Sequence, residues 1–292
     1  MIMQSEVYIL KKQIYFFTSL LLLSVTIFVS TSVVTITEYK LSYDNLPKEF
    51  DGFKILQLSD LHSADFGNNN EILIKKIDSV KPDIVVFTGD MINRDDINFD
   101  VFFDFCKEIS KKYKIYYIYG NHEMDLNANN AKILYDGMVK NNIKIINNKK
   151  ITIKKGKSKI NLYGLKYATK YYGKKDENSK YVLSEEDIVD YIKEANKDEF
   201  NIMLTHNPNY FDLYTNWGAD LTLTGHIHGG MIRIPFIGGF FSPDRTFFPK
   251  YDSGIYEQNG KNMIVNRGIG GEKGVRIFNN PEMVLITLKS NS

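Results

Sequence analysis

Three short apolar segments each end in a polar block, and each is followed by a stretch with helical spacing. The predicted strands and helices alternate as 53–58, 70–80, 84–87, 99–112, 115–119 and 131–141. Units of one strand and one helix imply right-handed crossovers and a mostly parallel sheet. The first half of the chain therefore predicts an α/β fold.

The polar blocks stand where such a sheet would bind a ligand. Asp60, Asp90 and Asn121 each follow one of the three predicted strands closely. Ligands of open α/β sheets lie outside the carboxyl ends of the strands. We therefore expect these three side chains to gather at one edge of the sheet.

Shorter predicted strands dominate the chain beyond Asn141. We expect a β meander at 143–146, 151–153 and 160–163 and further strands at 200–204 and 221–223. Strands at 263–265, 275–278 and 283–288 are expected to complete a second sheet. A helix capped by Ser184 is expected to reach Asn196. The polar and aromatic stretch 166–180, with Tyr171 and Tyr172, is predicted to be an exposed, solvated loop.

All five histidines lie in short polar blocks, and none is left for ordinary packing. The blocks read Ser59-Asp60-Leu61-His62, Gly120-Asn121-His122-Glu123, Thr205-His206-Asn207-Pro208 and Gly225-His226-Ile227-His228-Gly229, with Thr88-Gly89-Asp90 as a fifth block that has no histidine. Imidazole nitrogens combined with carboxylate oxygens suit a pair of transition-metal ions. The pattern therefore favours a two-metal hydrolytic site.

The spacing within the blocks suggests how they bind metal. In an extended segment, side chains two residues apart point to the same side, as Asp60 and His62 would, and as His226 and His228 would. Asp90, in the middle of the strand series, is the natural bridge between two ions. Because the set contains no cysteine, a structural zinc site is disfavoured, and Mn²⁺, Fe and Zn²⁺ all stay open.

An uncharged segment near the N-terminus predicts a membrane helix. It runs over 24 residues from Ile14 to Thr37, and as a helix it would span about 36 Å, enough to cross a bilayer. We expect an anchor at residues 1–37 and a catalytic domain at 38–292. Lys11 and Lys12 favour a cytoplasmic N-terminus and an extracytoplasmic domain. A signal peptide cleaved near Ser30-Thr31-Ser32 is the alternative.

Composition excludes several classes of function. The net charge of +2 gives no basis for nucleic-acid binding. A single cysteine, Cys106, cannot form an intrachain disulfide and is expected to be a buried filler on a helix. The sequence does not indicate an oligomeric state.

In this order, the blocks resemble the calcineurin-like metallophosphoesterase superfamily. Its pattern is Asp-x-His, Gly-Asp, Gly-Asn-His-Glu/Asp, His and Gly-His-x-His, and the resemblance covers residues 53–288. The resemblance implies a four-layer α/β/β/α sandwich with two central mixed sheets. It also implies a metal-dependent phosphoric ester hydrolase.

The resemblance further assigns roles to individual residues. One ion would be bound by Asp60, His62, Asp90 and His228, and the other by Asp90, Asn121, His206 and His226. A hydroxide bridging the ions would attack the phosphorus of a phosphodiester or pyrophosphate. His122 would be catalytic, as a general acid or as a stabiliser of the phosphoryl charge.

The C-terminal blocks, including Gly225 to Pro235 and Asn266 to Gly270, look like the membrane-associated bacterial phosphodiesterase branch. That branch implies a lipid-linked, nucleotide-linked or cell-wall substrate, with Arg267 as the candidate for substrate binding. The apolar stretch from Pro235 to Phe241 would either contact lipid, along its surface or as an acyl groove, or pack on its own sheet.

One position departs from the family pattern. Asn93 stands where many members carry an Asp that pairs with the histidine equivalent to His122. We expect Asp95 or Glu123 to support His122 instead. Two other functions stay open: a non-catalytic, metal-dependent cell-wall-binding protein, and a binuclear hydrolase of another bond class, such as an amidohydrolase.

Overall fold

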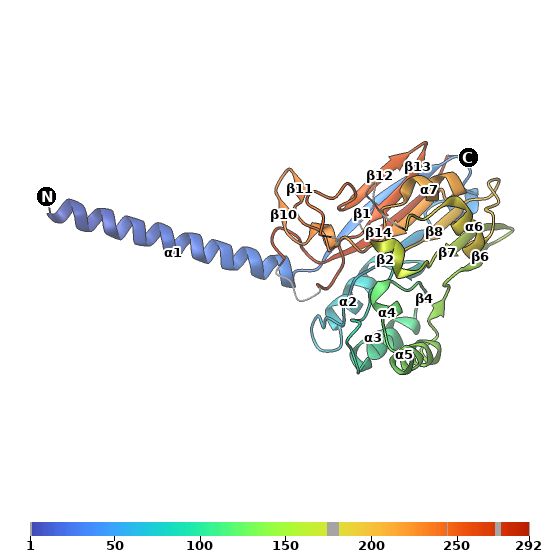
Figure 1. Cartoon of the computed structure of the whole chain (residues 1–292), viewed down its shortest axis with the longest axis horizontal. Coiled ribbons are helices and arrows are strands. Elements are labelled where there is room, and N and C mark those ends of the chain that lie inside the picture. The colour runs from blue at the N-terminus through green and yellow to red at the C-terminus, as the bar shows by residue number, and fades with distance from the viewer. Residues whose placement is uncertain (1, 174–180, 244, 272–275, 292) are drawn as a thin grey trace.

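A long N-terminal helix projects away from a folded domain (Figure 1). The computed structural model describes residues 2–173, 181–243, 245–271 and 276–291. Helix α1 (Ile2–Ser32) contains one stretch, Tyr8–Ser32, that is long and apolar enough to cross a membrane, with a mean hydropathy of 2.0. Only 6% of its most apolar window is buried in the protein. The helix ends before the predicted Thr37, because the β-branched run after Ser32 enters a strand.

The first sheet contains both ends of the folded domain. Its order is β1 (Thr35–Tyr43), β14 (Glu282–Ser290), β2 (Lys54–Leu58), β3 (Ile84–Phe87), β4 (Lys114–Tyr117) and β5 (Lys144–Ile145). β2 to β5 are parallel, as the sequence predicted, whereas β14 runs antiparallel to β2. The prediction that 283–288 completes the second sheet is wrong. β14 is placed in the first sheet by pairing in register with β1 on its other side.

Three helices cover one face of the first sheet: α2 (Glu71–Val80), α3 (Asp100–Ser110) and α5 (Ala128–Lys140). Their apolar side chains share a core with Leu56, Val85 and Phe87 of the sheet. Cys106 of α3 is fully buried in this core, as expected for a packing residue. The three strand and helix units predicted from the sequence are therefore present.

The second sheet is also mixed and six-stranded. Its order is β12 (Gly254–Gln258), β13 (Lys261–Val265), β9 (Leu221–Thr224), β8 (Asn201–Leu204), β7 (Ser158–Gly164) and β6 (Lys149–Lys155). α6 (Glu185–Ile192) and α7 (Phe211–Trp217) share an apolar core with Tyr163 and Met203 of this sheet. Ser184 caps α6 as predicted. The helix ends four residues before Asn196.

The predicted strand 275–278 is not found among the described residues 276–278. Only a single bridge pairs Ile277 with Ile232, and Phe278 turns into the left-handed region at φ 53°. Val275 lies outside the described residues. Short elements complete the chain: η1 (Lys48–Phe50), α4 (Asn121–Met124), η2 (Thr169–Tyr172), η3 (His228–Gly230), β10 (Arg233–Ile234) and β11 (Gly238–Gly239).

One apolar cluster contains side chains from both sheets. Ile55, Val86 and Ile286 of the first sheet lie in it together with Leu204 and Leu223 of the second. Burying branched aliphatic residues from two sheets is the main force that holds such sheets together. The loops that follow the strands of each sheet are brought close to each other as a result.

Strand directions place α1 near one edge of the first sheet. Because β14 is antiparallel to β2 and parallel to β1, the start of β1 lies at the same end of the sheet as the carboxyl end of β2. Thr35, three residues after α1, pairs with Glu282, whose backbone N–H donates to Gly268. A Cβ added at Gly268 would lie 2.8 Å from the Cβ of Asp60. The N-terminal helix and the predicted metal edge are thus at the same end of β2.

Candidate metal centre

Most of the expected ligands stand on strained turns rather than on extended chain. Asp60, His62, Asp90, His226 and His228 all have φ between 49° and 71°. The prediction that pairs two residues apart share one side of an extended segment is therefore wrong. Non-glycine residues rarely adopt this left-handed region, and each costs about 1–3 kcal/mol. Five such residues in one place indicate that the backbone is bent to aim these side chains.

Asp60, His62 and His228 form the first cluster. The Nε2 atoms of His62 and His228 lie 3.2 Å apart, and Nε2 of His228 lies 3.3 Å from Oδ1 of Asp60. All three residues are buried. Ligand atoms about 2.1 Å from one metal ion are separated by about 3.0–3.4 Å in tetrahedral or octahedral geometry. The three atoms therefore have the spacing of ligands around one cation.

Asn93 holds the His62 ring in position. Its Oδ1 lies 3.1 Å from Nδ1 of His62, and its Nδ2 donates to the His62 carbonyl at 2.9 Å. A proton on Nδ1 leaves the lone pair of Nε2 pointing at His228 and Asp60. The position that often supports the histidine equivalent to His122 thus supports a different histidine here.

The second cluster joins the two sheets through Asp90, His206 and His226. Nε2 of His206 lies 3.1 Å from Oδ2 of Asp90, while Nδ1 donates to the carbonyl of Thr88 at 2.6 Å. Burial would lower the pKa of His206, but the carboxylates of Asp90 and Asp60 raise it to about 10. The two acids therefore create a negative potential that favours a cation at this point.

Asn121 offers an unpaired acceptor to the same place. Its Oδ1 is buried without a hydrogen-bond partner, at the start of α4 and beside Asp90 and His226 in one pocket. A buried acceptor without a partner costs about 1–3 kcal/mol. An amide oxygen is also a metal ligand. The seven predicted ligands therefore fit a metal centre in both donor type and spacing.

The carboxylate of Glu123 holds the Asp90 turn through hydrogen bonds to its backbone. Its carboxylate accepts the backbone N–H groups of Asp90, Met91 and Gly120 at 2.7–2.9 Å and the hydroxyl of Tyr117 at 2.5 Å. Burial, together with the charge of Asp90, raises the pKa of Glu123 to about 7. The expectation that Glu123 supports His122 is not met, because both oxygens are engaged with this turn.

Arg94 is the partner of His122 instead. The backbone N–H of Arg94 donates to Nδ1 of His122 at 3.2 Å, and Nη2 of Arg94 lies 2.9 Å from Nε2 of the ring. Nη1 pairs with Asp125 at 2.8 Å. A neutral ring has one acceptor nitrogen, so His122 accepts either from the Arg94 backbone at Nδ1 or from the guanidinium at Nε2, and not from both at once. In either case the cationic guanidinium borders this space, which suits an anionic oxygen.

These groups open into a cavity of about 270 Å³. It is lined by Asp90, Arg94, Asn121, His122, Asp125, Thr169, Tyr172, His226, His228 and Pro243. The prediction of a solvated loop around Tyr171 and Tyr172 is wrong, since both are buried and the Tyr172 ring lies 5.1 Å from that of His226. Sequence reasoning missed Arg94 and Tyr172. The position of Arg94, four residues after Asp90, could have indicated it.

Arg267, the predicted substrate-binding residue, does not line this cavity among the described residues. Nη2 of Arg267 forms an ion pair with Oε1 of Glu282 at 2.8 Å. Its side chain packs beside Gly229, the residue after His228, and links this turn to the start of β14. Arg94 is the arginine among the described lining residues of the cavity.

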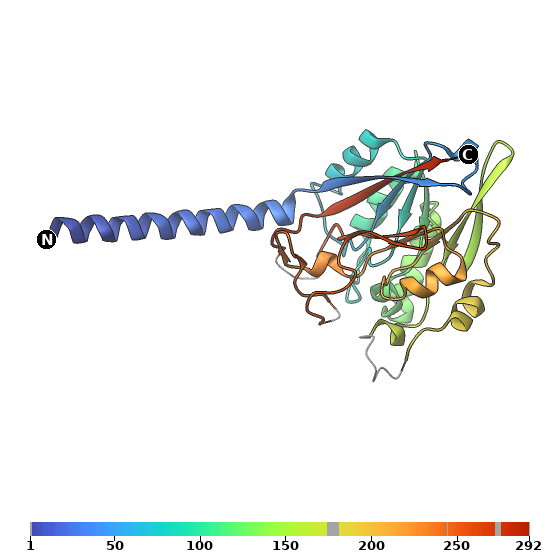
Figure 2. The same cartoon turned by 90° about the horizontal axis from the view of Figure 1, so that it is seen from above.

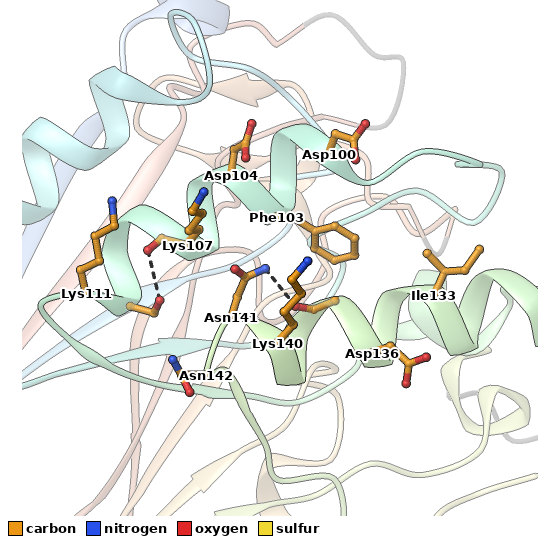
Figure 3. Close-up of a pocket in the computed structure, with 12 residues that line it drawn as sticks. Asp100, Phe103, Asp104, Lys107, Lys111, Ile133, Asp136, Lys140, Asn141 and Asn142 are labelled. Atoms are coloured by element: carbon orange, nitrogen blue, oxygen red, sulfur yellow. Dashed lines mark hydrogen bonds between the residues drawn. The ribbon is translucent and has the colours of Figure 1, made fainter.

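A larger groove lies between α3 and α5, away from the histidines (Figure 3). It has a volume of about 760 Å³, and Phe103, Ile133 and several lysine and aspartate side chains line it. Among its described lining residues there is no histidine, and the exposed lysines Lys107, Lys111 and Lys140 are solvated side chains on helix surfaces. The smaller cavity, and not this groove, is lined by predicted metal ligands.

The sequence matches the family described as "Calcineurin-like phosphoesterase" over residues 53–230, more than half of the chain. The metallophosphoesterase YkuE of Bacillus subtilis is 28% identical, covering 89% of this chain and 87% of that protein. Phosphodiesterase YaeI of Escherichia coli is 25% identical, covering 81% and 82%. UDP-2,3-diacylglucosamine pyrophosphatase LpxG of Chlamydia trachomatis is 25% identical, covering 83% and 86%. The chain belongs to the bacterial calcineurin-like metallophosphoesterases and is a metal-dependent phosphoester hydrolase.

Proposed function

We propose that this protein is a membrane-anchored, binuclear-metal phosphodiesterase or pyrophosphatase. Residues 1–37 would anchor it in the bacterial cell membrane, and residues 38–292 would form an extracytoplasmic catalytic domain built as a four-layer α/β/β/α sandwich. The single observation that carries the proposal is the convergence of two buried ligand clusters, Asp60 with His62 and His228, and Asp90 with His206 and His226.

We assign Asp60, His62, Asp90 and His228 to one metal ion. The other ion is assigned to Asp90, Asn121, His206 and His226, so that Asp90 is shared. Bound metal ions would supply an acidified water and positive charge for the phosphoryl oxygens. The protein contributes the fixed turns and the hydrogen bonds from Thr88 and Asn93 that orient the imidazoles. Mixed nitrogen and oxygen donors leave Mn²⁺, Fe and Zn²⁺ as candidates.

His122 and Arg94 act on the substrate in this proposal. With Nδ1 of His122 accepting from the Arg94 backbone, Nε2–H would donate to the leaving-group oxygen, and the guanidinium of Arg94 would turn from the ring to a phosphoryl oxygen in the cavity. Burial lowers the pKa of His122 to about 3, against the opposing charge of Asp90. The ring is therefore neutral at pH 7. It would stabilise the developing charge by hydrogen bonding and keep its proton, because loss of Nε2–H from a neutral ring would leave an imidazolate.

A lipid-linked phosphodiester or pyrophosphate is the substrate class that we favour. One relative is named a UDP-2,3-diacylglucosamine pyrophosphatase and another a phosphodiesterase. In this chain the Asp60 turn lies at the same end of β2 as the start of β1 and α1. A helix anchored in a bilayer would hold that end of the domain close to lipid head groups.

Hydrolysis assays with the full chain test the proposal. With added Mn²⁺, the protein should hydrolyse bis-p-nitrophenyl phosphate faster than the monoester p-nitrophenyl phosphate. Asp90→Ala and His122→Ala should each lower this activity at least about a hundredfold, whereas Asp136→Ala, which removes an exposed acid on α5, should not. Unchanged activity of both site variants, or a strong preference for the monoester, would refute the assignment.

A further inference from the structure

Exposed apolar side chains gather around the β10 and β11 segment. Phe236 and Ile237 stand at the tip between the two strands, and Phe247, Phe248 and Phe278 lie on neighbouring loops. Each of the five has more than half of its surface exposed, and Phe236 is fully exposed. We call these five residues the aromatic edge. Large apolar side chains in water at one place mark a surface that contacts something outside the chain.

The aromatic edge is connected to the end of α1. Phe278 lies two residues before Asn280, whose Nδ2 donates to the carbonyls of Val29 and Val33 at 3.2 Å. Ile277 pairs with Ile232, next to β10. Figures 1 and 2 both place the β10 and β11 region (orange) at the end of the domain where α1 joins it. The edge therefore faces the side from which the apolar helix leaves.

The same edge borders the metal cavity. The backbone N–H of Phe241 donates to Gly230, two residues after His228. Pro243 lines the cavity and lies four residues before Phe247, on a loop closed by the hydrogen bond from Ser242 to Thr246. If the aromatic edge contacts a surface, that contact would fix how far the cavity mouth lies from the surface and in which direction the mouth faces.

Charge and shape favour a lipid surface over a buried acyl chain. Arg245 and Lys250 are exposed and stand two residues from Phe247 and Phe248 in the chain, and cations close to aromatic residues are typical of interfacial membrane contacts. The hollow beside Phe236 is lined by the ion pair of Arg233 with Asp252, at 3.0 Å. A charged lining does not suit an acyl chain. The rings point outward instead, with Phe236 held at φ 67°.

We propose that the aromatic edge inserts into the interface of the leaflet next to the end of α1. It forms a second membrane contact that turns the metal cavity toward lipid head groups. This inference rests on the proposed membrane anchor. Asn280 and the buried Val34 already tie the end of α1 to the domain, and the second contact would hold the domain in one orientation against the bilayer.

Tryptophan fluorescence of the full chain in vesicles tests the contact directly. Phe236→Trp is reconstituted into vesicles of phosphatidylglycerol and phosphatidylethanolamine, with and without brominated acyl chains. The control is Tyr135→Trp on α5, a residue that is about half exposed and lies on the helices away from α1. The native Trp217 is buried and serves as the internal reference.

We expect the new indole of the Phe236→Trp variant to be quenched by brominated chains and shielded from aqueous acrylamide, with the Tyr135→Trp variant showing the reverse. Equal accessibility of both indoles to acrylamide would overturn the second contact. Shielding in the Phe236→Trp variant that rises with protein concentration, without quenching by brominated chains, would show a second copy of the chain on this surface and would also overturn it. If the wild-type chain does not float with the vesicles, the anchor itself is wrong, and both proposals fail together.

Activity gives an independent readout. Phe236→Ser with Ile237→Ser should lower kcat/KM about tenfold for a phosphodiester lipid in vesicles, because less apolar surface holds the domain at the interface. Hydrolysis of water-soluble bis-p-nitrophenyl phosphate should not change. Val139→Ser, which removes an exposed apolar side chain from α5, is the control. Equal losses on both substrates would show a structural role and contradict the proposal.

Discussion

The two sheets supply different chemistry to the candidate metal centre. Asp60, His62, Asp90 and Asn121 follow β2, β3 and β4 of the first sheet, whereas His206, His226 and His228 follow β8 and β9 of the second. The first sheet thus supplies every oxygen ligand and one imidazole, and its two carboxylates would repel each other without a cation. The second sheet supplies only imidazoles, which alone would bind a cation weakly. Neither sheet therefore holds the proposed metal site by itself. Metal binding depends on how the sheets pack.

The largest effect should come from the carboxylate shared between the clusters. Asp90→Ala removes a ligand of both proposed ions, so we expect activity to fall by a factor on the order of 10³ or more, equivalent to at least about 4 kcal/mol. His206→Ala, on the second sheet, should remove one ion. Bis-p-nitrophenyl phosphate hydrolysis and metal analysis by mass spectrometry measure both effects.

The metal content of the two variants tests whether Asp90 is shared between the two ions. Asp90→Ala should retain less metal than His206→Ala, and Asp136→Ala should match the wild type. Equal retention in the two site variants would show that Asp90 is not shared between the ions.

His122 should separate chemistry from metal binding. It lies within reach of His62 and Asp90, yet it is hydrogen-bonded to Arg94. His122→Ala should lower kcat by about 10²–10³, the usual contribution of one positioned hydrogen-bond donor, with the metal content unchanged. A loss of metal in this variant would make His122 a ligand and weaken the proposed assignment.

Glu123 accepts backbone N–H groups of the turns that follow the first sheet, and it does not contact a ligand side chain of the second sheet. Glu123→Gln places an amide N–H₂ against backbone donors, which should cost about 1–3 kcal/mol of stability and lower Tm. Thermal unfolding followed by circular dichroism measures the change. The exposed Glu108→Gln on α3 is the control and should leave Tm unaltered.

Arg94 should have the smallest effect. Its guanidinium borders the cavity but is itself half exposed and paired with Asp125, so Arg94→Ala should raise KM about tenfold with little change in kcat. Initial rates over a range of substrate concentrations separate the two constants. As a comparison, Lys107→Ala in the larger groove should change neither. A matching rise in KM for Lys107→Ala would shift attention to that groove.

The sequence predicted the first sheet and the ligand set better than the connections between them. Strands β2 to β4 follow from apolar runs, and the blocks at their ends gather as expected. The left-handed turns at Asp60 and His226 could not be read from local spacing, because only tertiary contacts stabilise them. Asn93 contacts His62, and Arg94 rather than Asn93 contacts His122. This choice of partners likewise depends on backbone geometry and not on residue type.

The placement of β14 escaped prediction for a related reason. An apolar C-terminal strand fits either sheet by composition, and only its pairing with β1 and β2 decides between them. Tyr172 was misjudged because its neighbours are polar. Its burial comes from a cluster of tyrosines distant in sequence, among them Tyr167, Tyr210 and Tyr214.

The pairing of β1 with β14 has a consequence for biosynthesis. Thr35 to Tyr43 emerges directly behind the apolar helix, but its neighbour Glu282 to Ser290 is translated after every other described strand. Until then no strand pairs with β1, and the long separation in sequence between β1 and β14 slows the closure of the sheet. The domain can thus complete its first sheet only once β14 has left the ribosome, when α1 would already be in the bilayer. Deleting β14 would leave β1 without its partner strand and the first sheet incomplete.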